Sequence, residues 1–227
     1  LTSRHILKQI PRSERRMLMA MLPAYEAHVA QRGGRSFIQY FGCHSMSLHW
    51  RFSGKVYFVV MRNVLPAGSW LVFDLKGATA NRRALASSFL SSLDSVAATR
   101  GGGGAAYGTL RDWEWLDIAM AVDVSPADKE ELADTLQADA AFLAEQGSLD
   151  YSLLVGVHRL PAQLEGAARD VRIAELVSHG GFASADRQKV YFFGIIDVLE
   201  RYRLRWKVQR AVLTLGYALM LRARDAD

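Results

Sequence analysis

The chain has 227 residues, 50% of them hydrophobic, which is enough for a substantial core and for one large or two small domains. Its 28 lysines and arginines exceed its 23 acidic residues, and the net charge of +5 favours anionic partners without choosing among nucleic acid, nucleotide phosphates and acidic membranes. The single cysteine, Cys43, excludes an intrachain disulfide and makes an intracellular compartment the simplest interpretation.

The first 75 residues are predicted to form strands and one helix. Residues 5–10 are typical of a short strand that ends at Pro11, and Ser13 is placed to cap a helix that follows. Pro23 is expected to kink or shorten this helix. Runs rich in β-branched and aromatic residues then predict an antiparallel sheet, with a hairpin turn at Ser53 and Gly54; these runs are 36–42, 45–52, 55–61 and 69–75.

The middle of the chain changes character. Residues 84–108 are rich in alanine, serine and glycine and predict a flexible insertion. The glycines at 101–104 do not fit a phosphate-binding loop, because no strand precedes them and no lysine with serine or threonine follows. Ser125 and Pro126 predict the start of a helix that ends at Gly147, with one apolar stripe formed by Leu132, Leu136, Ala140 and Leu143.

The last quarter is predicted to contain a looser segment at 160–188 and a basic helix at about 199–222. The arginines of that helix suit either an ordinary solvated face or a contact with an anionic surface. The apolar run at 211–221 is too short to span a bilayer, and residues 1–12 lack a signal-peptide pattern. These features indicate a soluble or membrane-peripheral protein.

Two aspartates lie at the ends of apolar runs that predict buried strands: Asp150 in LDYSLLVGVH and Asp197 in YFFGIIDVLE. Because an ionised carboxylate is costly to bury without a partner, such residues line a cleft, cap a turn or pair with an arginine. Lys8 on the first strand and Glu14 at the start of the first helix could form an ion pair. A lysine for nucleotide phosphates, a carboxylate for magnesium and a carboxylate near the attacking hydroxyl are what phosphoryl transfer requires.

The motifs FDLKGATANRRA (73–84), LDYSLLVGVH (149–158) and FFGIIDVL (192–199) resemble the phosphatidylinositol phosphate kinase family, and they are closer to its type I and type II enzymes. The stretches ILK at 6–8, MLPAY at 21–25, YFVVMRNVLP at 57–66 and LRDWEW at 110–115 extend the resemblance over nearly the whole chain. The implied fold is α+β, a two-lobed lipid kinase fold. It has an antiparallel N-lobe with one main helix at 1–66 and a mixed α/β C-lobe at 67–227, and we expect it to be incomplete at both ends.

The resemblance also implies roles for single residues. Lys8 matches the lysine that binds nucleotide phosphates, Glu14 its helix partner, Asp150 the catalytic-loop aspartate and Asp197 the metal aspartate, while Lys76 matches a lysine near the transferred phosphate. The connection between the lobes, including Met61 and Asn63, is expected to bind the adenine. The implied cofactors are ATP and Mg²⁺, and the implied reaction converts phosphatidylinositol 4-phosphate to the 4,5-bisphosphate.

The departures from the family pattern leave an alternative open. The family's glycine-rich loop and specificity loop are absent from this sequence, and Ala78 replaces the usual serine after DLKG. The chain is therefore either an active lipid kinase or a weak or inactive kinase-fold module that serves as a structural or interaction domain of a larger protein or assembly. The expected partner is a phosphoinositide at an anionic membrane surface, with a cytoplasmic, membrane-peripheral location and no nucleic acid.

Overall fold

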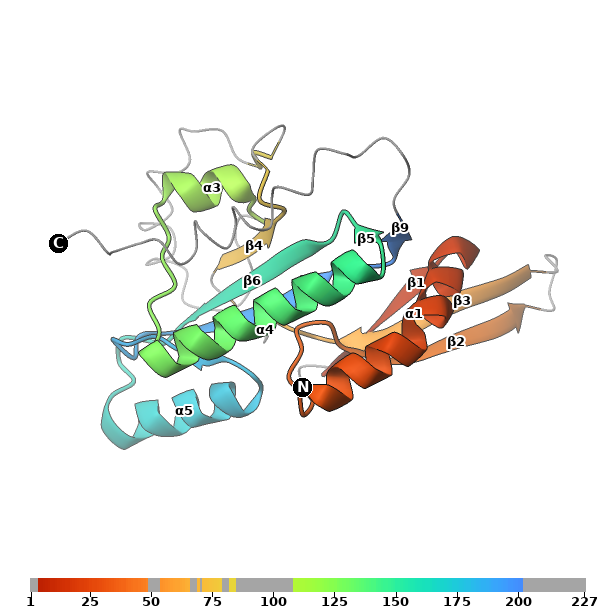
Figure 1. The fold of residues 1–227 in the computed structure, drawn as a ribbon. Coiled ribbons are helices and arrows are strands. Elements are labelled where there is room, and N and C mark those ends of the chain that lie inside the picture. Colours follow the sequence, from red (N-terminus) through yellow and green to blue (C-terminus); the bar gives the residue numbers. More distant parts are fainter. Residues whose placement is uncertain are drawn as a thin grey trace.

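The computed structural model describes residues 4–48, 54–65, 69, 71–78, 82–84 and 108–201. These residues form two lobes, each built around an antiparallel sheet with helices packed beside it (Figure 1). The arrangement confirms the predicted α+β class, and the first lobe contains one helix as expected.

The first lobe contains β1 (His5–Ile10), α1 (Arg12–Gln31), β2 (Tyr40–Leu48) and β3 (Gly54–Arg62). Its sheet has the strand order β1-β3-β2, and both pairings are antiparallel. Helix α1 buries Met17, Leu18, Met21 and Tyr25. Leu18 and Met21 belong to the same core as Ile10 and Val59 of the sheet, so the helix covers one sheet face.

Two predictions for this lobe were wrong in detail. The N-cap of helix α1 is Pro11 instead of Ser13. The helix is not shortened at Pro23, whose exposed ring removes one backbone donor while Met21 and Tyr25 stay buried, and a kink at Pro23 stays a prediction. The predicted strands 36–42 and 45–52 correspond to one strand, β2, which begins only at Tyr40; Cys43 and His44 continue its ladder against β3, with an irregularity at Tyr40/Gly42. Residues 49–52 of the second prediction lie outside the described residues. The predicted turn at Ser53 lies outside the described residues.

The second lobe contains β4 (Leu71–Leu75), α3 (Asp112–Asp117), α4 (Pro126–Glu145), β5 (Ser148–Leu149), β6 (Ser152–Arg159), α5 (Gly166–Ser178), β7 (Phe182–Ala183), β8 (Lys189–Ile196) and β9 (Glu200–Arg201). Its main sheet has the order β4-β6-β8-β7, and β5 pairs separately with β9. Strand β4 therefore belongs to this sheet and not to that of the first lobe. Among the described residues, no helix has the length and apolar character needed to cross a bilayer.

The predicted helix after Ser125 is confirmed as α4, and the Ser125 hydroxyl accepts a hydrogen bond from the Asp128 N–H. The segment 160–188 is not loose, because it contains α5, which buries Ile173 and Leu176 three residues apart. The predicted basic helix at 199–222 is wrong at its start, where β9 pairs with β5, and its remainder lies outside the described residues. So does the predicted insertion, apart from Ala84 and Gly108.

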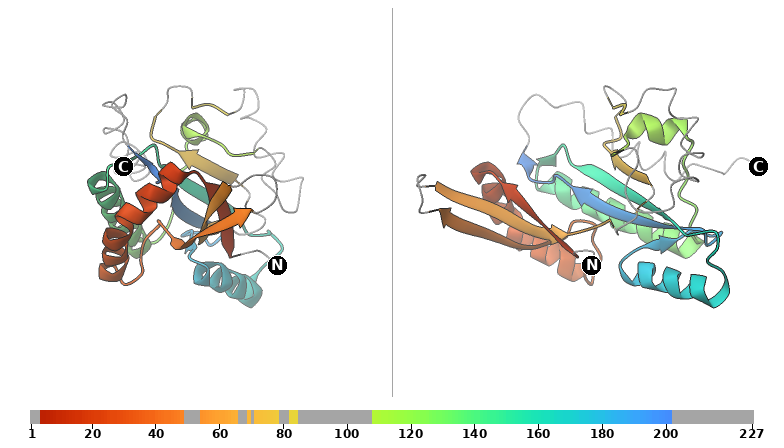
Figure 2. Two further views of the ribbon diagram at one scale, coloured as in Figure 1. Left: turned by 90° about the vertical axis from the view of Figure 1, so that its right-hand side faces the viewer. Right: turned by 180° about the vertical axis from the view of Figure 1, so that it is seen from behind.

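Helix α4 lies along the sheet of the second lobe, and α1 lies beside it along the sheet of the first (Figures 1 and 2). The central strands β6 and β8 are buried at almost every position. This explains their unbroken apolar sequence, because a strand that is covered on both faces shows no alternation of polar and apolar residues.

The connection that leaves β3 packs onto the same two strands at glycines. A Cβ atom on Gly194 would lie 2.4 Å from Val64 Cγ2, and one on Gly156 would lie 2.4 Å from Leu65 Cδ2. The two glycines thus allow the connection to approach the sheet closely. The resulting contact fixes the position at which the chain passes from the first lobe to the second.

Substitution Gly194→Ala tests this packing. The added methyl group must displace Val64, and overpacking of this kind costs about 1–3 kcal/mol. We expect a corresponding loss in the free energy of unfolding, measured by urea denaturation. Gly54→Ala is the control, because a Cβ atom there meets nothing within 4 Å. Equal effects of the two substitutions would contradict the contact.

A pH dependence follows from His158 on β6. Burial, and to a lesser extent the charge of Arg172, lowers the pKa of His158 below its ordinary 6.5. As the pH falls, the unfolded chain binds this proton first, so stability is full above about pH 6.5 and is lost below it. In urea titrations between pH 7.5 and 5, His158→Gln is expected to lose less stability on acidification than the wild type. Identical slopes would count against the prediction.

Candidate active site

The pairing of β6 with β8 brings Asp150 and Asp197 to one end of the sheet. Ser152 lies opposite Ile196 in the register, and the two aspartates lie just outside this last pair. On the far side of the aspartates the chains pair again, with Leu149 opposite Glu200. Asp150 therefore comes before its long strand, whereas Asp197 comes directly after its own. The β6–β8 and β5–β9 pairings thus hold Asp150 and Asp197 side by side, between the two pairs of strands.

Both aspartates have a left-handed backbone, with φ of 63° for Asp150 and 60° for Asp197. Apart from glycine, only Ala119 and Arg187 share this region among the described residues. Such conformations are uncommon for residues with a side chain and often occur at functional sites, where the surrounding structure offsets their cost. The backbone conformation thus supports the prediction from the sequence that these two aspartates belong to a functional site.

Lys8 reaches Asp197 across the lobes. Its Nζ atom lies 2.6 Å from Asp197 Oδ1, and the two side chains are 45% and 51% exposed. A pair this exposed contributes little net stability. Lys8 can therefore leave Asp197 to bind a phosphate, and Asp197 can leave Lys8 to bind a cation, at a small cost in free energy. Glu14 lines the same pocket as Lys8, and its predicted pairing with Lys8 stays a prediction.

Lys76, directly after β4, holds Asp150. Its Nζ atom lies 2.6 Å from Asp150 Oδ1 and donates to the Asp150 carbonyl oxygen at 2.8 Å. Lys76 is 19% exposed in its side chain and Asp150 is 43% exposed. The lysine therefore fixes both the backbone and the carboxylate of Asp150, while that carboxylate remains accessible.

Asp112 was missed by the sequence reasoning, although it lies in the quoted stretch LRDWEW. Its buried carboxylate accepts hydrogen bonds from the Lys76 N–H at 3.1 Å, the Gly77 N–H at 2.6 Å and Arg82 Nε at 2.8 Å. Arg82 also contacts Asp74, whose Oδ1 lies 3.3 Å from Arg82 Nη2. These contacts hold the turn that carries Lys76. An acidic residue directly before Trp113, in a segment with a second tryptophan two residues on, was the available signal.

The predicted residues from both lobes line a pocket of about 100 Å³, formed by Lys8, Glu14, Tyr40, Val59, Met61, Lys76, Asp150, Asp197 and Leu199. This volume suits an ion and a phosphate group; whole small-molecule sites span about 300–1,000 Å³. Asn63 is not among these residues. Its N–H donates to the Arg4 carbonyl oxygen and its Oδ1 accepts from the Leu65 N–H, so its predicted role at the adenine stays a prediction.

Two tyrosines near the aspartates stay protonated at neutral pH. Burial, together with the charges of Asp197 and Glu14, raises the pKa of Tyr40. Burial raises the pKa of Tyr151 to about 12. Neither phenol can act as a base at neutral pH, which leaves the carboxylates as the groups able to accept a proton here.

The donor set fits a nucleotide-bound magnesium ion. Mg²⁺ prefers hard oxygen ligands and in phosphoryl transfer sites is held by one or two carboxylates plus substrate phosphates. Asp197 offers such an oxygen beside Lys8, whose ammonium group suits the phosphates. No group of three or more histidine, cysteine or acidic side chains in the described ranges could hold a metal by itself.

Comparison with known proteins agrees with this geometry. A family model described as Phosphatidylinositol-4-phosphate 5-Kinase matches residues 2–179. A phosphatidylinositol 4-phosphate 5-kinase of Plasmodium falciparum is 25% identical over 93% of this chain and 13% of its own length. A probable phosphatidylinositol phosphate kinase of Dictyostelium discoideum is 26% identical over 93% of this chain and 36% of its own length.

Phosphatidylinositol 4-phosphate 5-kinase 7 of Arabidopsis thaliana is 32% identical over 71% of this chain and 19% of its own length. In these three comparisons the chain thus spans between 13% and 36% of the relative.

Asp112→Ala tests the support beneath Lys76. The substitution leaves the largely buried Arg82 without its best partner, and breaking a buried ion pair costs about 3–5 kcal/mol. We expect a loss of that order in the free energy of unfolding, measured by chemical denaturation. Asp117→Ala is the matched control on the same helix, because its pair with Arg83 is far more exposed and is worth less than about 1 kcal/mol. A loss no larger than the control's would refute the role of Asp112.

Proposed function

Because the chain belongs to the phosphatidylinositol-4-phosphate 5-kinase family, we propose that it transfers the γ-phosphoryl group of ATP to the inositol ring of a phosphoinositide, converting phosphatidylinositol 4-phosphate to the 4,5-bisphosphate. One observation carries the proposal: two lysines and two aspartates from both lobes line one pocket, with a Lys8–Asp197 pair and a Lys76–Asp150 pair. Phosphoryl transfer needs positioning and charge neutralisation more than covalent chemistry, and these groups supply both.

Each residue then has a distinct task. The Lys8 ammonium group binds nucleotide phosphates, for which it exchanges its weak pair with Asp197. Asp197 would hold Mg²⁺, which when bound neutralises phosphate charge. Asp150 accepts the proton of the attacking inositol hydroxyl, and Lys76 orients the Asp150 carboxylate. Lys76 is also placed to bind the transferred phosphate.

The setting follows from the substrate. A phosphoinositide lies in an anionic membrane surface, so the proposal places the protein at the cytoplasmic face of a membrane as a peripheral protein. The net charge of +5 suits such a surface.

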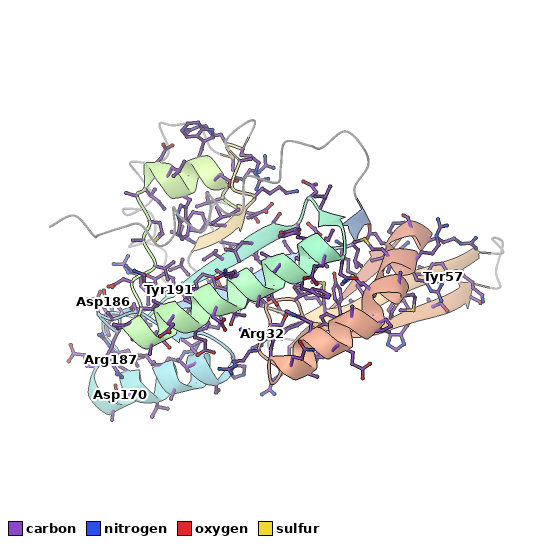
Figure 3. All side chains as sticks on the ribbon, viewed as in Figure 1. Arg32, Tyr57, Asp170, Asp186, Arg187 and Tyr191 are labelled. Atoms are coloured by element: carbon purple, nitrogen blue, oxygen red, sulfur yellow. The ribbon has the colours of Figure 1, made fainter. Side chains whose placement is uncertain are left out.

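The reaction is tested with the full-length polypeptide, labelled ATP and vesicles that contain phosphatidylinositol 4-phosphate, its 3- and 5-phosphate isomers or unphosphorylated phosphatidylinositol. We expect the 4,5-bisphosphate as product, and we expect Asp150→Asn to lower kcat by about 10²–10⁴-fold through loss of the general base. Asp170→Asn is the control, since Asp170 lies on α5 and pairs with Arg187, away from β5 and β9 (Figure 3). An equal rate in the Asp150 variant would overturn the assignment.

A structural module of the same fold would give a different result. Saturation with Mg-ATP at 100 times its Kd should stabilise a nucleotide-binding kinase by about 2.7 kcal/mol, and Lys8→Met should abolish most of this shift. A melting temperature that Mg-ATP leaves unchanged, with no lipid product, would favour the inactive module.

A further inference from the structure

Two acids outside the pocket are 0% exposed among the described residues, Glu114 of α3 and Asp139 of α4, and Asp139 is the one that lies where the two lobes meet. Its carboxylate lies 2.7 Å from His28 Nε2 and accepts hydrogen bonds from Ser36 Oγ at 3.0 Å and the Phe37 N–H at 2.6 Å. Asp139 lies on the inner face of the helix with Leu132 and Leu143, where an apolar side chain would ordinarily pack. A buried carboxylate is by itself weak evidence for stability, so a role in orientation is the hypothesis that its partners suggest.

All three partners come from the first lobe. His28 lies on α1, and Ser36 and Phe37 lie in the segment that joins α1 to β2. The His28 ring also stacks on Phe142 of α4, with centroids 4.6 Å apart and an angle of 15° between the planes. The carboxylate therefore fixes α1 and the start of β2 against α4.

The Phe37 peptide extends this contact to the strand that carries Asp197. While its N–H donates to Asp139, its carbonyl oxygen accepts a hydrogen bond from the Ile195 N–H at 2.9 Å. Ile195 lies two residues before Asp197. The backbone of Phe37 is thus held between Asp139 of α4 and Ile195 of β8, and we call this arrangement the Phe37 clamp.

The Phe37 clamp determines how the first lobe meets the aspartates. Helix α1 and strand β1 carry Glu14 and Lys8, which line the pocket together with Asp197. We propose that Asp139 is a positioning residue that sets the first lobe, and with it Lys8, against Asp197 through the Phe37 clamp. The inference rests on the function proposed above, because it assigns Lys8 to the nucleotide.

An exposed ion pair joins the same two helices and provides a matched control. Arg32 at the end of α1 lies 2.5 Å from Asp134 Oδ2 of α4, where the two helices meet (Figure 3). Asp134 is 67% exposed in its side chain, in contrast to Asp139. A solvated pair of this kind constrains orientation weakly. Loss of Asp134 therefore changes the same interface without releasing the clamp.

The test compares Asp139→Leu and Asp139→Asn with Asp134→Asn in the full-length protein. Leucine removes every acceptor and suits the apolar surroundings, whereas asparagine retains one acceptor for the Phe37 N–H. Amide hydrogen exchange is followed in peptides that contain Phe37 and Ile195. We expect exchange at both sites to rise about 10-fold or more in the leucine variant, to rise less in the asparagine variant and to match the wild type in the control.

Kinetics separate positioning from mere folding. Because Lys76 and Asp150 belong to the second lobe, the KM for lipid in the Asp139 variants should stay within about twofold of the wild type. The KM for ATP should rise, and kcat should fall by about 10–100-fold, which is the size of effect that a small misplacement of reacting groups produces. Loss of folded enzyme alone would lower kcat and leave both KM values unchanged. Should leucine prevent folding, the asparagine variant carries the same comparison.

The exchange measurement needs no catalysis, so it tests the clamp even if the wild type phosphorylates no lipid. Unchanged exchange at Ile195 in both Asp139 variants would overturn the inference, as would equal effects from Asp134→Asn. Increased exchange with unaltered KM for ATP would reduce Asp139 to a structural role.

Discussion

The antiparallel pairing of β6 with β8 is the constraint on which the rest of the site depends. Its register places Asp150 and Asp197 just beyond the Ser152–Ile196 pair, and the shorter β5–β9 pairing closes the ladder on their other side. Because both neighbouring segments are hydrogen-bonded, the aspartates can keep a left-handed backbone that an open loop would not hold. Helix α4, the β3 connection and the turn that carries Lys76 all pack or bond around these two strands.

Charged groups divide into two classes by their burial. The Lys8–Asp197 pair is about half exposed, so it contributes little stability and its partners can be exchanged. Asp112 and Asp139 are buried, and each accepts several hydrogen bonds from segments far away in the chain. Removing such an acid leaves its buried donors without an acceptor, which is costly even where the intact pair adds little net stability. The solvated groups are therefore suited to chemistry and the buried groups to placing them.

Much of the fold was predictable because its signals are local. The strand at 5–10 and the helix after Ser125 follow from apolar spacing and capping residues, and both agree with the structure. Errors arose where local preference lost to packing. β2 continues through Gly42 against β3, and α5 was missed because only Ile173 and Leu176 are buried along it.

The sequence by itself determined which residues could carry the chemistry. Carboxylates at the ends of apolar runs and a lysine on the first strand can be identified from the sequence alone, because they depend only on residue type and position in the chain. Only the tertiary structure decided their partners: Lys8 pairs with Asp197, 189 residues away, and Lys76 pairs with Asp150. It also revealed Asp139, which looks like an ordinary helix residue until His28, Ser36 and Phe37 close around it. Pairings of this kind depend on how separate helices and strands pack together, and the local sequence around each residue does not specify which distant residue becomes its partner.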